Sequence, residues 1–323
     1  MIFSRFWTNA ALPFRKKNET LLSREMGRIR RVVGAVLLWC TAWPVSSNTR
    51  HSASGRKEPC THNRFGTDTV REGIYDFEGR FEPIHREMFK QNGYIIVRNL
   101  VNEEIVKRFH AKHFGNDASK KSGTPMCGRG CAGQPQRLKM HITAKLLNEA
   151  LNQFGPGLFM ALNLLKGDKT VDFSNTTDYK KEIFAAGRNI HSHNNVALPG
   201  AVFQNPHWDV ANSHKNIHGM VLVDVPLVDV TRMNAPIEIW KGTQKLNYEE
   251  IFANPTEIVP VSNTYRQYWH CFDGMLEAAH QRPSAIIQSR AGDVLLRNPS
   301  TWHRGSPNNA TRPRDMITIL IQP

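Results

Sequence analysis

Apolar residues follow a helical period in the middle of this chain of 323 residues. Residues 103–113 place their apolar side chains on one helical face, and Asn102 is a suitable N-cap because acidic residues follow it in the first turn. A second helix is expected over residues 141–154, and the Gly-Pro-Gly sequence at 155–157 is expected to stop it. Residues 94–97 precede both helices as the first expected strand, after an Asn-Gly turn. We therefore expect helices to flank the sheet that the rest of the chain forms.

The pattern changes to short strands from residue 202 onward. Runs of β-branched and other apolar residues alternate there with clusters of Gly, Pro and Asn. The expected strands are residues 202–204, 217–225, 237–240, 258–261, 284–288, 294–297 and 316–321. Many short strands separated by turns indicate a mainly β fold with flanking helices, namely a cupin-like jelly roll, also called a double-stranded β-helix.

The triplet His207-Trp208-Asp209 is a candidate metal-binding motif. On an extended segment alternate side chains project to the same side, so His207 and Asp209 can hold one ion while Trp208 points away. Imidazole nitrogens with a carboxylate oxygen suit iron, manganese or zinc, and no cysteine flanks the motif as in a closed structural zinc site. Taken alone, the triplet also fits polar loop residues in a chain with fourteen histidines.

A second segment supplies the remaining candidates. His303 follows Asp209 by 94 positions and is expected just beyond a strand end, because the Pro, Ser, Asn and Gly residues around it do not favour regular structure. Arg314 is expected at the start of the last strand, where its guanidinium can hold a carboxylate through two parallel hydrogen bonds. Arg312 is the alternative, because it also precedes that strand closely. A dicarboxylate co-substrate needs such an arginine.

These features resemble the phytanoyl-CoA dioxygenase family of non-haem iron, 2-oxoglutarate-dependent oxygenases, over residues 88–322. Besides the three candidate ligands, residues 89–100 are similar to the opening segment of the family. Residues 234–244 are similar to its central Asn-Gly-Pro … Pro-Gly-Ser/Thr-His motif. The departures from that motif are Ala235 for Gly, Lys241 for Pro and Gln244 for His. They bear on loop shape and substrate contacts rather than on the iron site.

The resemblance implies that His207, Asp209 and His303 bind Fe(II) and that Arg314 pairs with the distal carboxylate of 2-oxoglutarate, with O2 as the other co-substrate. It also implies hydroxylation of a carbon of a small-molecule substrate, with release of succinate and CO2. Halogenating relatives lack the carboxylate ligand, so Asp209 favours oxygen insertion, whereas desaturation or ring closure would use the same residues. Acyl-CoA thioesters and secondary metabolites both occur as substrates in the family, so the substrate stays open.

Two other functions are compatible with the same residues. A cupin-like binding protein would keep the fold without turnover, and a zinc hydrolase would use the two histidines and the aspartate to hold zinc with a nucleophilic water. Arg314 has no role in the hydrolase mechanism. His191 and His193 form a second pair on one side of an extended segment, which we interpret as a polar strand or loop because no third ligand accompanies it.

The N-terminal part of the chain differs in charge from the rest. The first sixty residues carry eleven Lys and Arg against three Glu, which supplies +8 of the net charge of +14. We expect residues 1–62 to be a basic extension and residues 63–323 to be a single dioxygenase domain. Within residues 26–50, arginines precede a short apolar run, as in a secretory signal or signal anchor; an organellar transit sequence and a disordered arm of a cytoplasmic protein are the alternatives. The C-terminus lacks a Ser-Lys-Leu peroxisomal signal.

The basic extension also bears on partners. Clustered Lys and Arg bind phosphate backbones, but the extension contains no recognisable nucleic-acid module, so nucleic acid is not expected as a partner. Membrane contact is expected only through this extension, if it is a signal anchor. Cys127 and Cys131 are the only close pair among five cysteines, and we interpret their Gly-rich surroundings as a flexible loop, with a local disulfide or a metal site as alternatives.

Overall fold

The structure, a computed structural model, describes residues 68–78, 80–125, 136–166, 171–172, 190–209, 219–246 and 278–321. All the elements named below lie within the unit Glu58–Pro323. The expected N-terminal extension, the Cys127 and Cys131 loop and the expected strand at 258–261 lie outside the described residues. Within the described part of the chain, no helix combines the length and the apolar character needed to span a bilayer.

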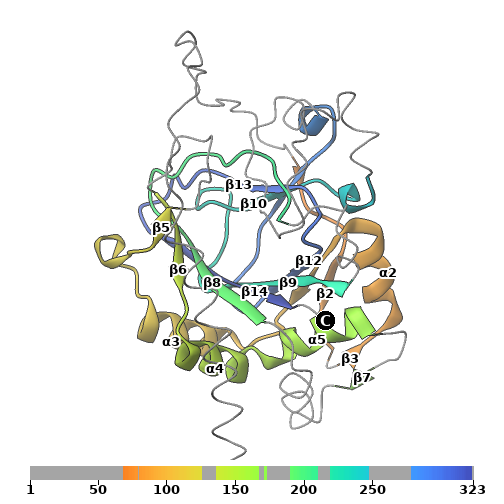
Figure 1. The fold of residues 1–323 in the computed structure, drawn as a ribbon, viewed down its shortest axis with the longest axis horizontal. Helices are drawn as coiled ribbons and strands as arrows, with labels where there is room; N and C mark the ends of the chain where they lie inside the picture. The colour runs from red at the N-terminus through yellow and green to blue at the C-terminus, as the bar shows by residue number, and fades with distance from the viewer. Residues whose placement is uncertain are drawn as a thin grey trace, which may run out of the picture. The chain divides into compact units, whose positions relative to one another are not determined.

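An eight-stranded sheet is the largest element of the fold (Figure 1). In spatial order its strands are β2 (Ile74–Asp76), β4 (Tyr94–Arg98), β12 (Val294–Arg297), β9 (Val221–Pro226), β14 (Arg314–Ile321), β8 (Ile190–Ala197), β6 (Arg137–His141) and β5 (Thr124–Pro125). Neighbouring strands are antiparallel except β2 and β4, which are parallel. Strands distant in sequence therefore lie side by side, as a jelly roll requires.

A four-stranded sheet lies opposite the large one. Its order is β1 (Asp68–Thr69), β11 (Ala285–Ile287), β10 (Ile237–Ile239) and β13 (His303–Gly305). Apolar side chains from both sheets form one buried cluster that includes Tyr94, Ile96, Leu295 and Met316 from the large sheet and Ile237, Ile239 and Ile287 from the small one. A separate pair of short strands joins β3 (Arg80–Phe81) to β7 (Val171–Asp172). The two facing sheets confirm the predicted double-stranded β-helix.

Helices cover the outer face of the large sheet (Figure 1). They are α2 (Pro83–Asn92), α3 (Glu103–His113), α4 (Ala144–Gln153) and α5 (Gly155–Lys166). Two short 3-10 turns, η1 (Ala118–Lys120) and η3 (Thr243–Lys245), lie in connecting segments. Side chains that alternate with the inner-facing ones, such as Val223 and Ile317, pack against helical residues such as Phe109 and Leu158. The sheet is thus mostly apolar on the helical side, where the ion pair of Asp315 with Lys121 is an exception. Asp224, Arg297 and Arg314 lie on the inner side.

The predicted helix at 103–113 has the bounds observed for α3, and the side chain of Asn102 accepts hydrogen bonds from the main-chain N–H groups of Glu104 and Ile105. The second predicted helix was wrong at its start. It begins only at Ala144, where Thr143 is the N-cap, and it ends at Gln153, next to the expected end at residue 154. The Gly-Pro-Gly sequence does not end the helical region, because α5 starts there. A proline is tolerated in the first turn of a helix, since its missing N–H would have no intrahelical partner at that position.

Two strand assignments need correction, and one segment for which the sequence allows a strand or a loop is a strand. The expected strand at 202–204 is absent, although Gln204 N–H donates to the carbonyl oxygen of Gly305 at 2.9 Å. His303 does not lie beyond a strand end: it begins β13, whose pairing with β10 outweighs the weak strand preference of the sequence that follows. The segment with His191 and His193, interpreted as a polar strand or loop, is strand β8 between β14 and β6.

Candidate metal and co-substrate site

The main chain brings His207 and Asp209 to His303. His207 N–H donates to the carbonyl oxygen of His303 at 2.9 Å, and His303 N–H donates to that of His207 at 2.8 Å. Asp209 N–H donates to the carbonyl oxygen of Pro299 at 2.8 Å, within the loop between β12 and β13. The two motifs are therefore joined by backbone pairing, which positions their side chains without help from an ion.

The three side chains form a compact donor group. One ligand atom of each of His207, Asp209 and His303 lies within 4.8 Å of those of the other two. The Nδ1 atoms of His207 and His303 lie 2.8 and 2.9 Å from the carbonyl oxygens of Asn205 and Thr301, respectively. A carbonyl accepts only, so each Nδ1 carries the proton and each Nε2 keeps its lone pair for a metal. Two nitrogens and one carboxylate oxygen, with no further His, Cys, Asp or Glu in this donor group of the described residues, fit Fe(II) with room for other ligands.

Burial and charge set the protonation of this group. Burial lowers the pKa of the His207 and His303 imidazoles. Burial alone would raise the pKa of Asp209, but Arg297, His303 and His207 outweigh it and hold the pKa of that carboxyl well below its usual range. Neutral imidazoles and an ionised carboxylate are the forms that bind metal, so the protonation of these three side chains at neutral pH suits metal binding.

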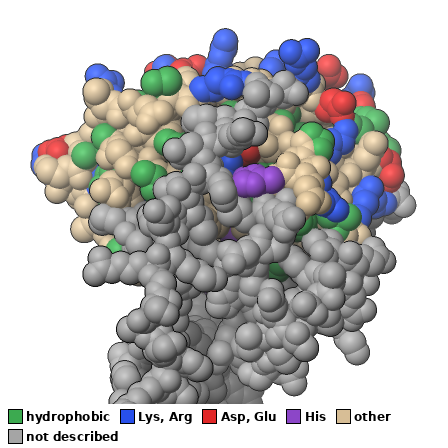
Figure 2. Space-filling view, turned by 90° about the horizontal axis from the view of Figure 1, so that it is seen from above, with side chains coloured by type: hydrophobic (Ala, Val, Ile, Leu, Met, Phe, Trp, Pro, Cys, Tyr) green, Lys and Arg blue, Asp and Glu red, His purple; other side chains and the backbone are tan. Residues whose placement is uncertain are grey.

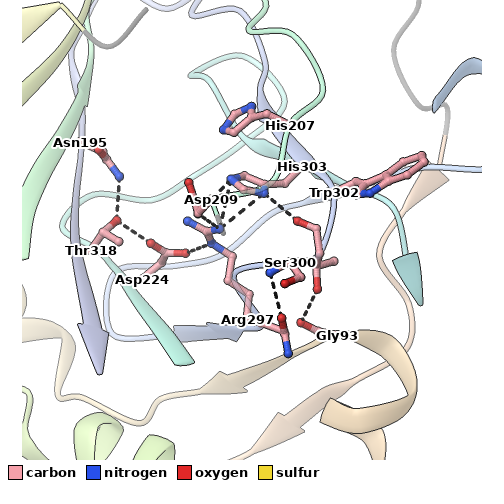
Figure 3. A network of polar contacts seen from close by, with 12 residues as sticks. Gly93, Asn195, His207, Asp209, Asp224, Arg297, Ser300, Trp302, His303 and Thr318 are labelled. Carbon is pink, nitrogen blue, oxygen red and sulfur yellow. Dashed lines mark hydrogen bonds and ion pairs between the residues drawn. The ribbon is translucent and has the colours of Figure 1, made fainter. Parts of the chain in front are cut away.

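Contacts from the motifs at 89–100 and 234–244 support His303. The hydroxyl of Thr243 accepts a hydrogen bond from Trp302 N–H at 2.9 Å, and the carbonyl oxygen of Gly93 accepts one from the Thr301 hydroxyl at 3.0 Å (Figure 3). Gly93 has φ 81°, in the left-handed region that favours glycine. The two segments that carry the family resemblance besides the ligands thus hold the loop that presents His303. Trp302 itself is buried.

Arg314 is the first residue of β14 and is 4% exposed. Its Nη1 donates to the carbonyl oxygen of Asn195 at 3.3 Å, and its Nε has no hydrogen-bond partner. Burial lowers the pKa of Arg314 to about 10, and Asp315 and Asp224 oppose that shift. Among the described residues Arg314 forms no ion pair, whereas Asp315 pairs with Lys121 and Asp224 with Arg297. Arg314 is therefore a buried cation that is short of an anion.

The alternative arginine occupies a different environment. Arg312 is exposed and precedes the strand, while Arg314 lies on it. Strand alternation puts Arg314 and Thr318 on the inner face of the large sheet together with Met316. Of the two, only Arg314 has the burial and the direction that a co-substrate site inside the jelly roll requires.

A chain of polar contacts connects the neighbourhood of Arg314 with the donor group (Figure 3). Asn195 Nδ2 donates to the Thr318 hydroxyl at 2.7 Å, and that hydroxyl donates to Asp224 Oδ1 at 2.5 Å. Arg297 then joins the two acids: its Nε donates to Asp224 Oδ2 at 2.6 Å and its Nη1 to Asp209 Oδ2 at 2.5 Å. None of these four supporting residues was predicted from the sequence to contribute to the site. A charged residue inside an otherwise apolar strand, as at Asp224 and Arg297, was the available signal.

His193 was likewise assigned no ligand role, and it lies on the inner face of β8. It is half-buried, and burial together with Lys139 lowers its pKa to about 4, while the nearby Asp209 opposes the shift. On the face that Figure 2 shows, histidine, basic and acidic side chains are visible among the uncharged ones. Because His193 lies on the inner face of β8 with Asp209 nearby, it adds a neutral imidazole to the surroundings of the donor group without joining it.

The chain is similar to one known family and to several solved structures. Residues 171–316 match the family described as Phytanoyl-CoA dioxygenase (PhyH). Among solved structures, the non-heme alpha ketoglutarate dependent carbocyclase SnoK from nogalamycin biosynthesis is similar at 14% identity and a TM-score of 0.48, with 73% of this chain and 82% of that chain covered. AviO1 from Streptomyces viridochromogenes Tue57 is similar at 14% identity and a TM-score of 0.45, with 75% and 95% covered.

The jelly roll, its His-Asp-His donor group and the family match define an oxidoreductase of the non-haem iron dioxygenase class. Residues 171–316, somewhat less than half of the chain, match the model of the phytanoyl-CoA dioxygenase family. The resemblance noted in the sequence is thereby confirmed.

Proposed function

We propose that this protein uses Fe(II), 2-oxoglutarate and O2 to hydroxylate a carbon of a small-molecule substrate, with release of succinate and CO2. The observation that carries the proposal is the presence of two features that a chain of polar contacts through Thr318, Asp224 and Arg297 connects. The first is the donor group of His207, Asp209 and His303. The second is Arg314, a buried guanidinium with no carboxylate partner among the described residues.

In the proposed mechanism the donor group would hold the iron through the Nε2 atoms of His207 and His303 and a carboxylate oxygen of Asp209. The carbonyl oxygens of Asn205 and Thr301 keep both rings in the required tautomer. The chemistry supplied there by the bound metal is O2 activation coupled to oxidative decarboxylation of 2-oxoglutarate, with one oxygen atom inserted into a substrate C–H bond. The retained carboxylate of Asp209 favours this outcome over halogenation.

Arg314 would bind the distal carboxylate of 2-oxoglutarate. Two parallel N–H donors match a carboxylate, and the free Nε supplies one donor that is at present unused. Burial of both partners strengthens the pair because water does not screen it. The bound carboxylate would also supply the negative charge that Arg314 lacks, and it would raise the lowered pKa of the guanidinium again. One residue can thus supply both affinity and orientation for the co-substrate.

The rest of the inner surface would orient the primary substrate. His193 projects from β8 on the same face as Thr318, and it stays neutral at physiological pH because of its lowered pKa. A neutral imidazole can donate and accept one hydrogen bond each, which suits a hydroxyl or a carbonyl on a substrate. Acyl-CoA thioesters and secondary metabolites both remain candidate substrate classes.

The experiment that tests this function measures succinate. Full-length protein is incubated with Fe(II), 2-oxoglutarate and O2, and metabolite extracts are screened for those that stimulate succinate formation. We expect stimulation that requires both iron and 2-oxoglutarate and that is lost in Asp209→Ala. A cupin-like binding protein would release no succinate with any extract. A zinc hydrolase would turn over its substrate without O2 or 2-oxoglutarate, and either result would refute the proposal.

A further inference from the structure

Arg297 extends from β12 into the donor group and is 5% exposed. Its Nε contacts Asp224 Oδ2 at 2.6 Å, and its Nη1 contacts Asp209 Oδ2 at 2.5 Å (Figure 3). The same Nη1 lies 3.1 Å from Nε2 of His303. Burying an arginine is costly unless carboxylates compensate it, and here two do.

Nη1 of Arg297 contacts Asp209 and His303 at the same atoms that would bind a metal ion. Nδ1 of His303 is committed to the carbonyl oxygen of Thr301, so the lone pair of the ring is on Nε2. Nη1 of Arg297 faces that lone pair and an oxygen of Asp209 at once. A divalent ion bound by these two donors would lie about 2.0–2.2 Å from each of them. The ion and the N–H donor cannot share that position, because both the space and the like charges forbid it.

We propose that Arg297 is an internal cation that closes the metal-binding position of the metal-free protein, and that a divalent ion binds by displacing Nη1 from Asp209 and His303. This inference rests on the proposed metal site, and it adds that Arg297 competes with the ion for Asp209 and His303. Only the distal end of the side chain has to move. Its Nε stays on Asp224, which is itself held by the Thr318 hydroxyl at 2.5 Å.

The balance of charge predicts how removal of Arg297 changes the affinity for a metal ion. Arg297 compensates two carboxylates, those of Asp209 and Asp224. Without the guanidinium these acids would repel each other, and a divalent ion at the donor group would supply compensation. Removing Arg297 should therefore destabilise the metal-free protein and tighten metal binding. If Arg297 instead served only to position Asp209 for the ion, its removal would weaken metal binding.

The test is calorimetric titration of the metal-free, full-length protein with Mn²⁺, in the absence of 2-oxoglutarate. We expect Arg297→Met to bind Mn²⁺ at least about tenfold more tightly than the parent and to gain more in Tm on adding Mn²⁺. Lys121→Met is the matched control, because Lys121 forms a buried ion pair with Asp315 on the helical side of the sheet at 3.0 Å. The control should lose stability and keep the parental Kd for Mn²⁺.

An unchanged or weaker Kd for Mn²⁺ in Arg297→Met would overturn the inference about Arg297 while leaving the metal site intact. Absence of Mn²⁺ binding to the parent would instead overturn the proposed metal site. If Arg297→Met does not fold, the parent labelled with ¹⁵N-arginine is titrated with Zn²⁺, and the Arg297 signals are assigned with Arg297→Lys. One equivalent should shift or broaden the Nη signals and leave the Nε–H signal in place; Nη signals insensitive to Zn²⁺ would contradict displacement.

Discussion

His207 and His303 are paired through their main chains, each donating its N–H to the carbonyl oxygen of the other, at 2.9 and 2.8 Å. Their ring centroids lie 4.4 Å apart. Because the pairing uses only backbone atoms, it survives replacement of either side chain. The donor group is consequently formed by the fold itself, and loss of a ligand should separate metal binding from folding.

His303→Ala and Asp209→Ala should each abolish substrate-stimulated succinate formation, because two donors cannot retain iron in competition with water. The backbone bridge persists in both variants, so each should unfold cooperatively as the parent does. Turnover and thermal unfolding are measured side by side. Parental turnover in either variant would be incompatible with the proposed site.

Arg314→Ala should raise the KM for 2-oxoglutarate about 10- to 100-fold, because a charge-assisted hydrogen bond contributes roughly 1.5–3 kcal/mol. At saturating 2-oxoglutarate the variant should keep most of the parental kcat, since the donor group is unchanged. Arg312→Ala is the matched control: Arg312 is exposed and should leave the KM unchanged. The assignment fails if Arg312→Ala, rather than Arg314→Ala, raises the KM.

The metal-free protein should lose stability as the pH falls below about 6.5. The pKa of His193 is lowered from 6.5 to about 4 in the folded protein, chiefly by burial, so the unfolded chain binds the proton first. This contribution is complete above pH 6.5 and declines as the pH falls toward 4; the lowered pKa values of His207 and His303 act in the same direction. Chemical denaturation at pH 7.5 and 5 measures the effect. His193→Gln should reduce the difference, and a parent equally stable at both pH values would exclude this linkage.

Gly93→Ala should destabilise the protein and disturb the site. A Cβ at Gly93 would lie 2.3 Å from the Thr301 hydroxyl oxygen and 2.4 Å from Oε1 of Gln244, in addition to the strain of φ 81°. Gly115→Ala is the control for strain alone, since Gly115 has φ 60° and nothing within 4 Å of its added Cβ. Equilibrium unfolding should show Gly93→Ala to be the more destabilising by more than about 1 kcal/mol. Equal losses would mean that the contact with the His303 loop contributes nothing.

Part of the site could be predicted because motif spacing and strand alternation are local properties. The same-side projection of His207 and Asp209 needs only an extended backbone, and Arg314 was expected at the strand start where it is found. Their approach to His303 was expected only through the family resemblance, because nothing local in the sequence specifies pairing across 94 residues.

The supporting network could not be predicted, since it depends on register. Asp224 pairs directly opposite Thr318 and Leu295, and only that register brings its carboxylate to Arg297. A slip of one residue would turn Asp224 toward the helices. Likewise, His303 enters a strand because β10 is available to pair with it, and α5 begins at a Gly-Pro-Gly sequence because its apolar residues pack under the sheet. In both cases tertiary contacts outweighed local preference.

The most direct test of the central claim, that the donor group and Arg314 together hold iron and 2-oxoglutarate, is visible absorption of the anaerobic protein. Addition of Fe(II) followed by 2-oxoglutarate should produce a metal-to-ligand charge-transfer band that requires both components, is absent in Asp209→Ala and needs more 2-oxoglutarate in Arg314→Ala. No band with both components present, or an undiminished band in Asp209→Ala, would contradict the account.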